Sequence, residues 1–165
     1  MKEYFDSEFC PFMEFRAPIM HRNALATIKG NSMYPRISGT VFFSKAPKGT
    51  QVIVKINGLP MYRPGTAGRT QIGPHGFHIH AGSSCENPDG HWNPDNQPHG
   101  NHAGDFPVLF SNNGYAQISF FTDRFSPRDI VGKTVVIHSG PDDYKTQPSG
   151  GSGEIIACGV IKAVG

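Results

Sequence analysis

The chain has 165 residues, a formal net charge of +2, 37% hydrophobic residues and 17% charged residues. This length predicts one domain with a single core, and the composition excludes a coiled coil or a strongly charged disordered tail. No basic run points to nucleic acid and no apolar stretch approaches the roughly 18 residues that span a bilayer, so neither nucleic acid nor a membrane is an expected partner.

Residues 1–22 mix aromatic residues and prolines without a period of 2 or 3.6. We interpret them as an N-terminal extension that precedes a domain at 23–165. They lack the apolar core of a signal peptide, which predicts a cytoplasmic protein as the chain is written. A protein whose leader had been removed would instead be exported or periplasmic. Cys10 has no predicted partner and is interpreted as a buried or free thiol.

Seven short runs of strand-like composition follow, at 24–28, 39–43, 51–56, 76–80, 115–121, 133–138 and 155–161. Gly, Asn and Pro separate them, which favours an all-β sandwich or barrel. One helical turn or two is expected at 126–130, where Ser126 precedes Pro127. The stretches 81–107 and 139–154 carry no strand pattern, and loops of this length are usually functional or disordered.

Six of the eight histidines lie between His75 and His102, which indicates a metal site. His78 and His80 stand two apart on the predicted strand 76–80, so both rings should leave one face of the sheet. A lone pair of this kind is more often a solvated strand face. The neighbouring ligands weaken that interpretation.

Further ligands follow in the loop and beyond it. Three histidines and a carboxylate, His91, His99, His102 and Asp105, are the ligand types that suit zinc or another borderline metal. His138 ends the apolar run 133–138. Alone it would be read as a core or edge histidine, and it gains weight only from the other histidines.

The strings GFHIH, GHWNP, PHGNHAGD, VVIH, PDD and ACGVI occur in this order. Over 23–165 the chain thereby resembles the copper-zinc superoxide dismutase family. The resemblance implies an eight-stranded Greek-key β-barrel of the Ig-like type with long metal-binding loops, its eighth strand near 107–110. It implies an enzyme that converts two superoxide anions to dioxygen and hydrogen peroxide by Cu(II)/Cu(I) cycling, with structural zinc. A homodimer is compatible with it, since family members dimerise through different surfaces.

The same resemblance implies a role for each candidate residue. Copper would be bound by His78, His80, His91 and His138, and zinc by His91, His99, His102 and Asp105, with His91 bridging the two ions and His91 and His138 counted as catalytic. Asp142 would link a copper-bound to a zinc-bound histidine. Cys85 and Cys158 would form a disulfide, against the alternative of two free thiols in a reducing cytosol. His75 would be structural rather than a ligand.

The chain also departs from the family pattern. Ile155 stands where the family usually carries an arginine that attracts the anion, which predicts lower turnover with weaker salt dependence. Only two residues separate His99 from His102, a shortened zinc loop. The alternative is therefore a catalytically weak or inactive superoxide dismutase-like metal-binding protein, which the complete copper set opposes. A zinc hydrolase is disfavoured because no Glu or Ser base stands beside the histidines.

Overall fold

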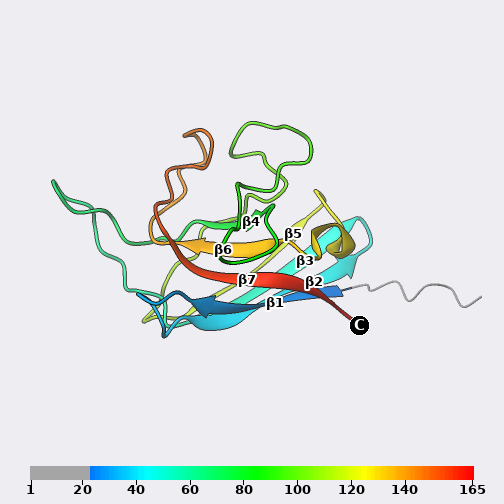
Figure 1. Cartoon of the computed structure of the whole chain (residues 1–165), viewed down its shortest axis with the longest axis horizontal. Coiled ribbons are helices and arrows are strands. Elements are labelled where there is room, and N and C mark those ends of the chain that lie inside the picture. Colours follow the sequence, from blue (N-terminus) through cyan, green and yellow to red (C-terminus); the bar gives the residue numbers. More distant parts are fainter. Residues whose placement is uncertain (1–22) are drawn as a thin grey trace, which may run out of the picture.

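The structure, a computed structural model, describes residues 23–165, and its strands form one antiparallel sheet (Figure 1). The strands are β1 (Asn23–Gly30), β2 (Ser38–Ala46), β3 (Gly49–Asn57), β4 (Phe77–His80), β5 (Ala116–Thr122), β6 (Thr134–His138) and β7 (Ile155–Val164). Across the sheet they run in the order β4-β6-β7-β1-β2-β3-β5. The proposed extension 1–22, with Cys10, lies outside the described residues, so the division at residue 23 stays a prediction.

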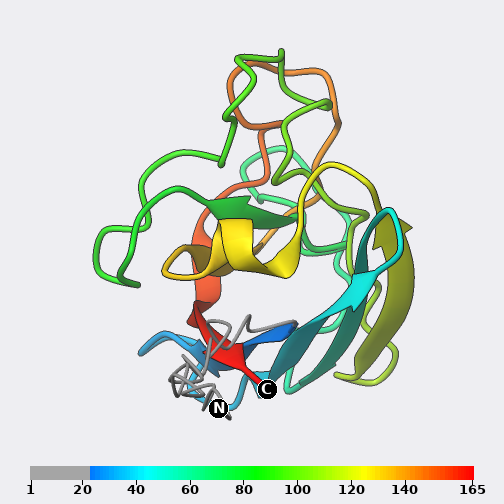
Figure 2. The same cartoon turned by 90° about the vertical axis from the view of Figure 1, so that its right-hand side faces the viewer.

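The sheet curls around a core that alternation along the strands creates (Figure 2). In β1, Ala24, Ala26 and Ile28 are fully buried while the residues between them face outward. Strands β2 and β3 repeat this period of two, which is the side-chain repeat of a strand. The chain passes from β3 to β4 and then to β5, from one edge of the sheet to the other. These features confirm the all-β prediction.

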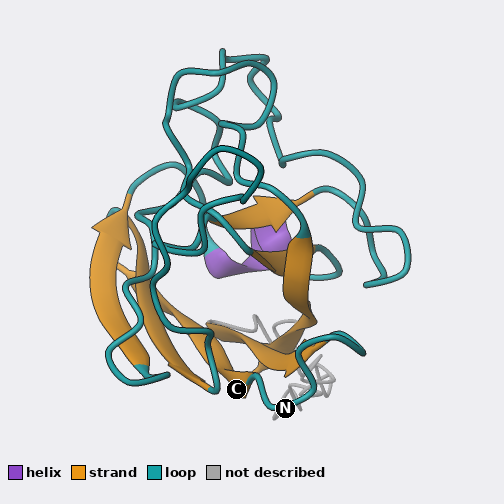
Figure 3. Cartoon of the chain, turned by 90° about the vertical axis from the view of Figure 1, so that its left-hand side faces the viewer, coloured by secondary structure: helices purple, strands orange, loops and turns teal. Residues whose placement is uncertain are grey.

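Strands β4 and β6 differ from the others because every residue in both is buried. Phe77 and Ile79 point into the core. The opposite face is covered by the long loops, which gather over this part of the sheet in Figure 3. A strand that is buried on both faces can carry polar side chains only if they find partners. The histidines of these strands are therefore placed under a loop cover rather than in open solvent.

The expected eighth strand at 107–110 is reduced to one bridge. Leu109 and His75 exchange two backbone hydrogen bonds, of 2.8 and 2.9 Å, and no other residue of 107–110 pairs in the described structure. Pro107 has no N–H to extend the ladder, which explains why a strand does not form here. The expected strand is therefore absent from the described residues as a regular element, although the all-β fold is as expected.

Two further features predicted from the sequence are present. The turn at 126–130 is a 3-10 helix, η1 (Pro127–Ile130), in which the Asp129 carboxylate accepts a 2.8 Å hydrogen bond from the Ser126 N–H. Cys85 and Cys158 form a disulfide across 73 residues and join the long loop to β7. Loop-closure entropy assigns such a crosslink a stabilisation of about 4 kcal/mol. Among the described residues, no helix has the length and apolarity to cross a membrane.

Candidate metal centre

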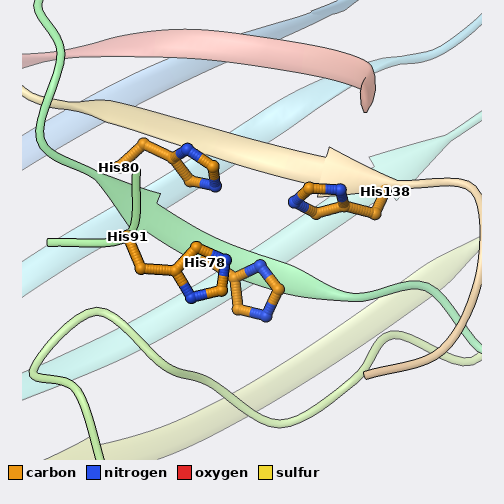
Figure 4. A group of neighbouring side chains, drawn as sticks. All are labelled: His78, His80, His91 and His138. Atoms are coloured by element: carbon orange, nitrogen blue, oxygen red, sulfur yellow. The ribbon is translucent and has the colours of Figure 1, made fainter. Parts of the chain in front are cut away.

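Four histidines converge beside β4 and β6 and form the four-histidine cluster: His78, His80, His91 and His138 (Figure 4). Their potential ligand nitrogens all lie within 4.8 Å of one another. The first two rings share one face of β4, as the spacing predicts, and the fourth stands at the end of β6. The third comes from the long loop, which is tied to β4 by a 2.8 Å hydrogen bond from the Trp92 N–H to the Ile79 carbonyl.

A second group shares His91 and forms the carboxylate cluster: His91, His99, His102 and Asp105. Its potential ligand atoms also lie within 4.8 Å of one another. The Asp105 carboxylate accepts hydrogen bonds from the amides of Gly100 and His102, at 2.8 and 3.0 Å. The loop is therefore wrapped around this carboxylate, and the shortened spacing from His99 to His102 still brings all four side chains together.

Hydrogen bonds fix which nitrogen of each buried ring carries a proton. His80 Nδ1 lies 2.6 Å from the Asp89 carbonyl, and His138 Nδ1 lies 2.9 Å from the Gly153 carbonyl. A carbonyl oxygen can only accept, so each of these nitrogens donates. The other nitrogen, Nε2, then presents a lone pair to the cluster, which is the form in which histidine binds a metal.

The second nitrogen of each ring has no hydrogen-bond partner in the described part of the chain. These atoms are His78 Nδ1, His80 Nε2, His91 Nε2, His99 Nδ1, His102 Nδ1 and His138 Nε2. Leaving a buried polar atom unpaired costs about 1–3 kcal/mol. Six such atoms directed into two clusters are explained by cations that accept their lone pairs. Nitrogen and oxygen donors of this kind suit zinc and copper. The residues of both clusters therefore fit these two ions.

Asp142 connects the two clusters through hydrogen bonds to one histidine of each. One carboxylate oxygen lies 2.6 Å from His78 Nε2, and the other lies 2.9 Å from His99 Nε2. Both nitrogens must donate to the carboxylate, which turns the Nδ1 lone pair of each ring toward its own cluster. Asp142 is itself held by a 2.7 Å hydrogen bond from the Tyr144 amide.

Burial lowers the pKa of two rings in the four-histidine cluster far below the ordinary value of 6.5. Desolvation takes the pKa of His80 to about 3 and that of His138 to about 4. The pKa of Asp105 also falls below its usual range. There burial acts in the opposite direction, but hydrogen bonds from His91 and from the His102 and Gly100 amides outweigh it. Near neutral pH His80 and His138 are therefore neutral and Asp105 is ionised, which are the forms that bind cations.

We expect the metal-free protein to lose stability as the pH falls from about 6.5 toward 4. In this window the unfolded chain takes up protons at His80 and His138, while the folded chain keeps both rings neutral. The free energy of unfolding then falls by up to about 1.4 kcal/mol per pH unit and per histidine, and the loss ends below the folded pKa values. Asp105 has a lowered pKa, so its contribution is lost only below its ordinary value of 3.8.

Urea unfolding of the metal-free protein between about pH 7.5 and about pH 4.5 measures this effect. The variant His138→Asn removes one of the two groups and should show a shallower dependence. A free energy of unfolding that stays constant between about pH 7 and about pH 5 would contradict the expected proton uptake.

Several residues that support the site were missed in the sequence. The Gln147 side chain brackets the backbone of His99: it accepts from the amide at 2.8 Å and donates to the carbonyl at 3.3 Å. Gly150 has φ +69°, and a Cβ there would overlap the Asp142 carboxylate. No signal in the sequence pointed to Gln147, which is an isolated glutamine. The signal for Gly150 was that it belongs to a pair of glycines in a long loop.

Ile155 occupies the position where an arginine was expected from the resemblance. It is the first residue of β7 and pairs with His138 across a register shift in the ladder. Its side chain is partly exposed. The chain therefore places an apolar residue, rather than a cation, next to the four-histidine cluster.

Comparison with known proteins agrees with this geometry. Residues 37–161 match the family model described as copper/zinc superoxide dismutase. The chain is 32% identical over 155 residues to a copper-zinc superoxide dismutase of Deinococcus radiodurans, covering 78% of this chain and 79% of that protein. It is 37% identical over 140 residues to that of Legionella pneumophila, with 78% and 80% covered. It is 35% identical over 146 residues to the copper-zinc superoxide dismutase of Escherichia coli, covering 75% of this chain and 78% of that protein.

Proposed function

Because the chain belongs to the copper/zinc superoxide dismutase family, we propose that the four-histidine cluster binds the copper and the carboxylate cluster the zinc of this superoxide dismutase. The enzyme converts two superoxide anions and two protons to dioxygen and hydrogen peroxide. The observation that carries the assignment is the set of six unpartnered ring nitrogens directed into the two clusters.

Copper, when bound, supplies the change between Cu(II) and Cu(I) that oxidises one superoxide and reduces the next, while zinc keeps one oxidation state. The chain's own residues set the conditions for this chemistry. The carbonyls of Asp89 and Gly153 hold the His80 and His138 rings in one tautomer and orientation. Burial keeps both rings neutral, so their Nε2 lone pairs are available at any pH above their lowered pKa values.

His91 is the residue that can hold and release a proton within the site. Its Nδ1 lies 2.8 Å from the Asp105 carboxylate, whereas Nε2 is unpartnered and belongs with the four-histidine cluster. Nε2 can carry a proton only while it is not a copper ligand, and that proton would then lie within the four-histidine cluster. The Nδ1 side of the ring would be held within the carboxylate cluster, so the imidazole keeps its position when the proton moves.

The first experiment is to measure superoxide dismutation by protein loaded with copper and zinc, with zinc-only protein as the blank. Activity that requires copper is the expected result. Copper bound at one equivalent without activity would favour the alternative, a metal-binding relative without turnover. The variant His138→Gln serves as a second blank, because it keeps the zinc ligands and removes one copper ligand.

Replacing Ile155 by arginine is expected to raise the rate at low ionic strength by roughly tenfold, the lower end of the range for electrostatic steering. The new cation would stand at the start of β7, opposite His138 in the ladder. Rates of parent and variant are compared between low and high salt, because screening removes the gain. The uncharged variant Ile155→Gln controls for polarity. An unchanged rate for the arginine variant at low salt would refute the role given to this position.

We also propose that the protein works in an oxidising compartment and forms a homodimer. The Cys85–Cys158 disulfide supports the first statement, because such bonds persist in exported and periplasmic proteins. The second rests on the resemblance alone. Thiol labelling in cell fractions tests the compartment, since Cys85 and Cys158 would both be reduced in a cytoplasmic protein. Sedimentation equilibrium tests the dimer.

A further inference from the structure

Arg124 reaches from the wall of the barrel into the segment that carries three zinc ligands. Its Nη1 donates to the His102 carbonyl at 2.8 Å and, at 3.4 Å, to the Asp105 carbonyl. Its Nη2 donates to Asn101 Oδ1 at 3.3 Å. Two of these three acceptors belong to residues of the carboxylate cluster. We propose that Arg124 is a positioning residue for the zinc site.

The segment 99–105 needs such a support because it has no regular structure. His99 is held by Gln147 and Asp142, both from the loop 139–154. Gly104 is held by backbone hydrogen bonds to Ile79 and Trp92. In the described part of the chain, the hydrogen bonds that residues 100–102 make outside the segment 97–105 all come from Arg124. The turn that carries His102 is thus held from within by the Asp105 carboxylate and joined to the barrel through Arg124.

The root of Arg124 is fixed by the core. It follows the end of β5, and its own amide donates to Thr122 Oγ1 at 3.3 Å. The next residue, Phe125, is buried and packs edge-on against Trp92 and Phe43, with ring centroids 5.6 and 6.4 Å apart. The backbone at Arg124 is therefore anchored to the barrel, and the guanidinium joins this anchor to the loop through its three hydrogen bonds.

The chemistry of the guanidinium suits this role. Its donors lie in one plane at fixed angles, and a hydrogen bond from a charged donor to a carbonyl is stronger than a neutral one. One group can therefore hold Asn101, His102 and Asp105 in a single arrangement. A lysine keeps the charge but offers a compact ammonium without the fork. Supporting residues of this kind affect metal affinity by about 10–100-fold.

The inference rests on the proposed zinc site, and its test separates the two. Zinc affinity is measured by chelator competition for the parent, Arg124→Gln, Arg124→Lys and the control Arg128→Gln. Arg128 lies four residues further along the chain, its side chain is largely exposed, and the ion pair that it makes among the described residues is with Asp129. We expect Arg124→Gln to lose at least tenfold in zinc affinity, Arg124→Lys to lose nearly as much, and the control to match the parent.

Two more measurements exclude other roles for Arg124. The visible spectrum of Co²⁺ in the zinc site should change in Arg124→Gln, because the ligands are held less firmly, and stay unchanged in the control. Thermal unfolding of the metal-free variant should match the parent. A clear drop would make Arg124 a general stabilising residue and overturn the proposal, as would parent-like zinc affinity in Arg124→Gln or Arg124→Lys. If His102→Gln leaves zinc binding intact, it is the proposed zinc site itself that fails.

Discussion

Removing the shared histidine should empty both metal sites, whereas removing an unshared one should empty only its own. The variant His91→Ala is expected to lose both metals, because His91 belongs to both clusters. His138→Gln should lose copper and all dismutase activity above background while it keeps about one zinc. His102→Gln should lose zinc and keep copper. The reason is that His138 and His102 each present one unpartnered nitrogen, to different clusters.

Metal content after dialysis, determined by mass spectrometry, and dismutation on the same samples give the result. His138→Gln and His102→Gln serve as matched controls for each other, since both replace a buried histidine by the same amide. Equal loss of copper and zinc in both variants would mean that the clusters do not act as separate sites. Near-normal activity in His138→Gln would remove that residue from the copper site.

The metal-ligand candidates could be predicted from the sequence because their patterns are short. His78 and His80 are two residues apart, and the period of a strand places both rings on one face without any knowledge of the rest of the fold. The loop ligands needed the resemblance, because spacing in an irregular segment does not fix geometry. The structure brings all of these side chains into two clusters, as the resemblance implies.

Apart from Asp142, whose role the resemblance implied, the supporting groups could not be predicted, for a physical reason. The partners of His80 and His138 are the backbone carbonyls of Asp89 and Gly153, and every residue has a carbonyl. Which one meets a ring depends on the path of two long loops. Gly150 is a similar case. A side chain is excluded at this position only because the Asp142 carboxylate lies against it, and that contact cannot be deduced from the sequence.

The strands were easier to predict than their edges. The predicted run 133–138 corresponds to β6 (Thr134–His138), because apolar β-branched residues dominate it. The expected strand at 107–110 does not form, because Pro107 limits its pairing to one bridge at Leu109. Pairing at a sheet edge depends on individual N–H groups, so composition is a weak guide there.

Replacing Asp142 by asparagine is expected to weaken both metal sites by about 10–100-fold, although Asp142 belongs to neither set of ligands. Its carboxylate accepts from His78 Nε2 at 2.6 Å and from His99 Nε2 at 2.9 Å. An asparagine offers one oxygen and one NH₂ group, so one of the two rings faces a donor. That ring must rotate or move its proton to Nδ1, and a protonated Nδ1 cannot bind a metal.

Copper and zinc affinities are measured by chelator competition on Asp142→Asn, with Asp143→Asn as the matched control. The neighbouring Asp143 undergoes the same loss of charge, but within residues 23–165 its carboxylate accepts hydrogen bonds from Lys145 and Thr146 alone. The control should therefore keep parent-like affinities. Because the amide can satisfy either ring but not both, one metal should be affected more than the other. Equal affinities in Asp142→Asn and the parent would show that the tautomers of His78 and His99 are set by something other than this carboxylate.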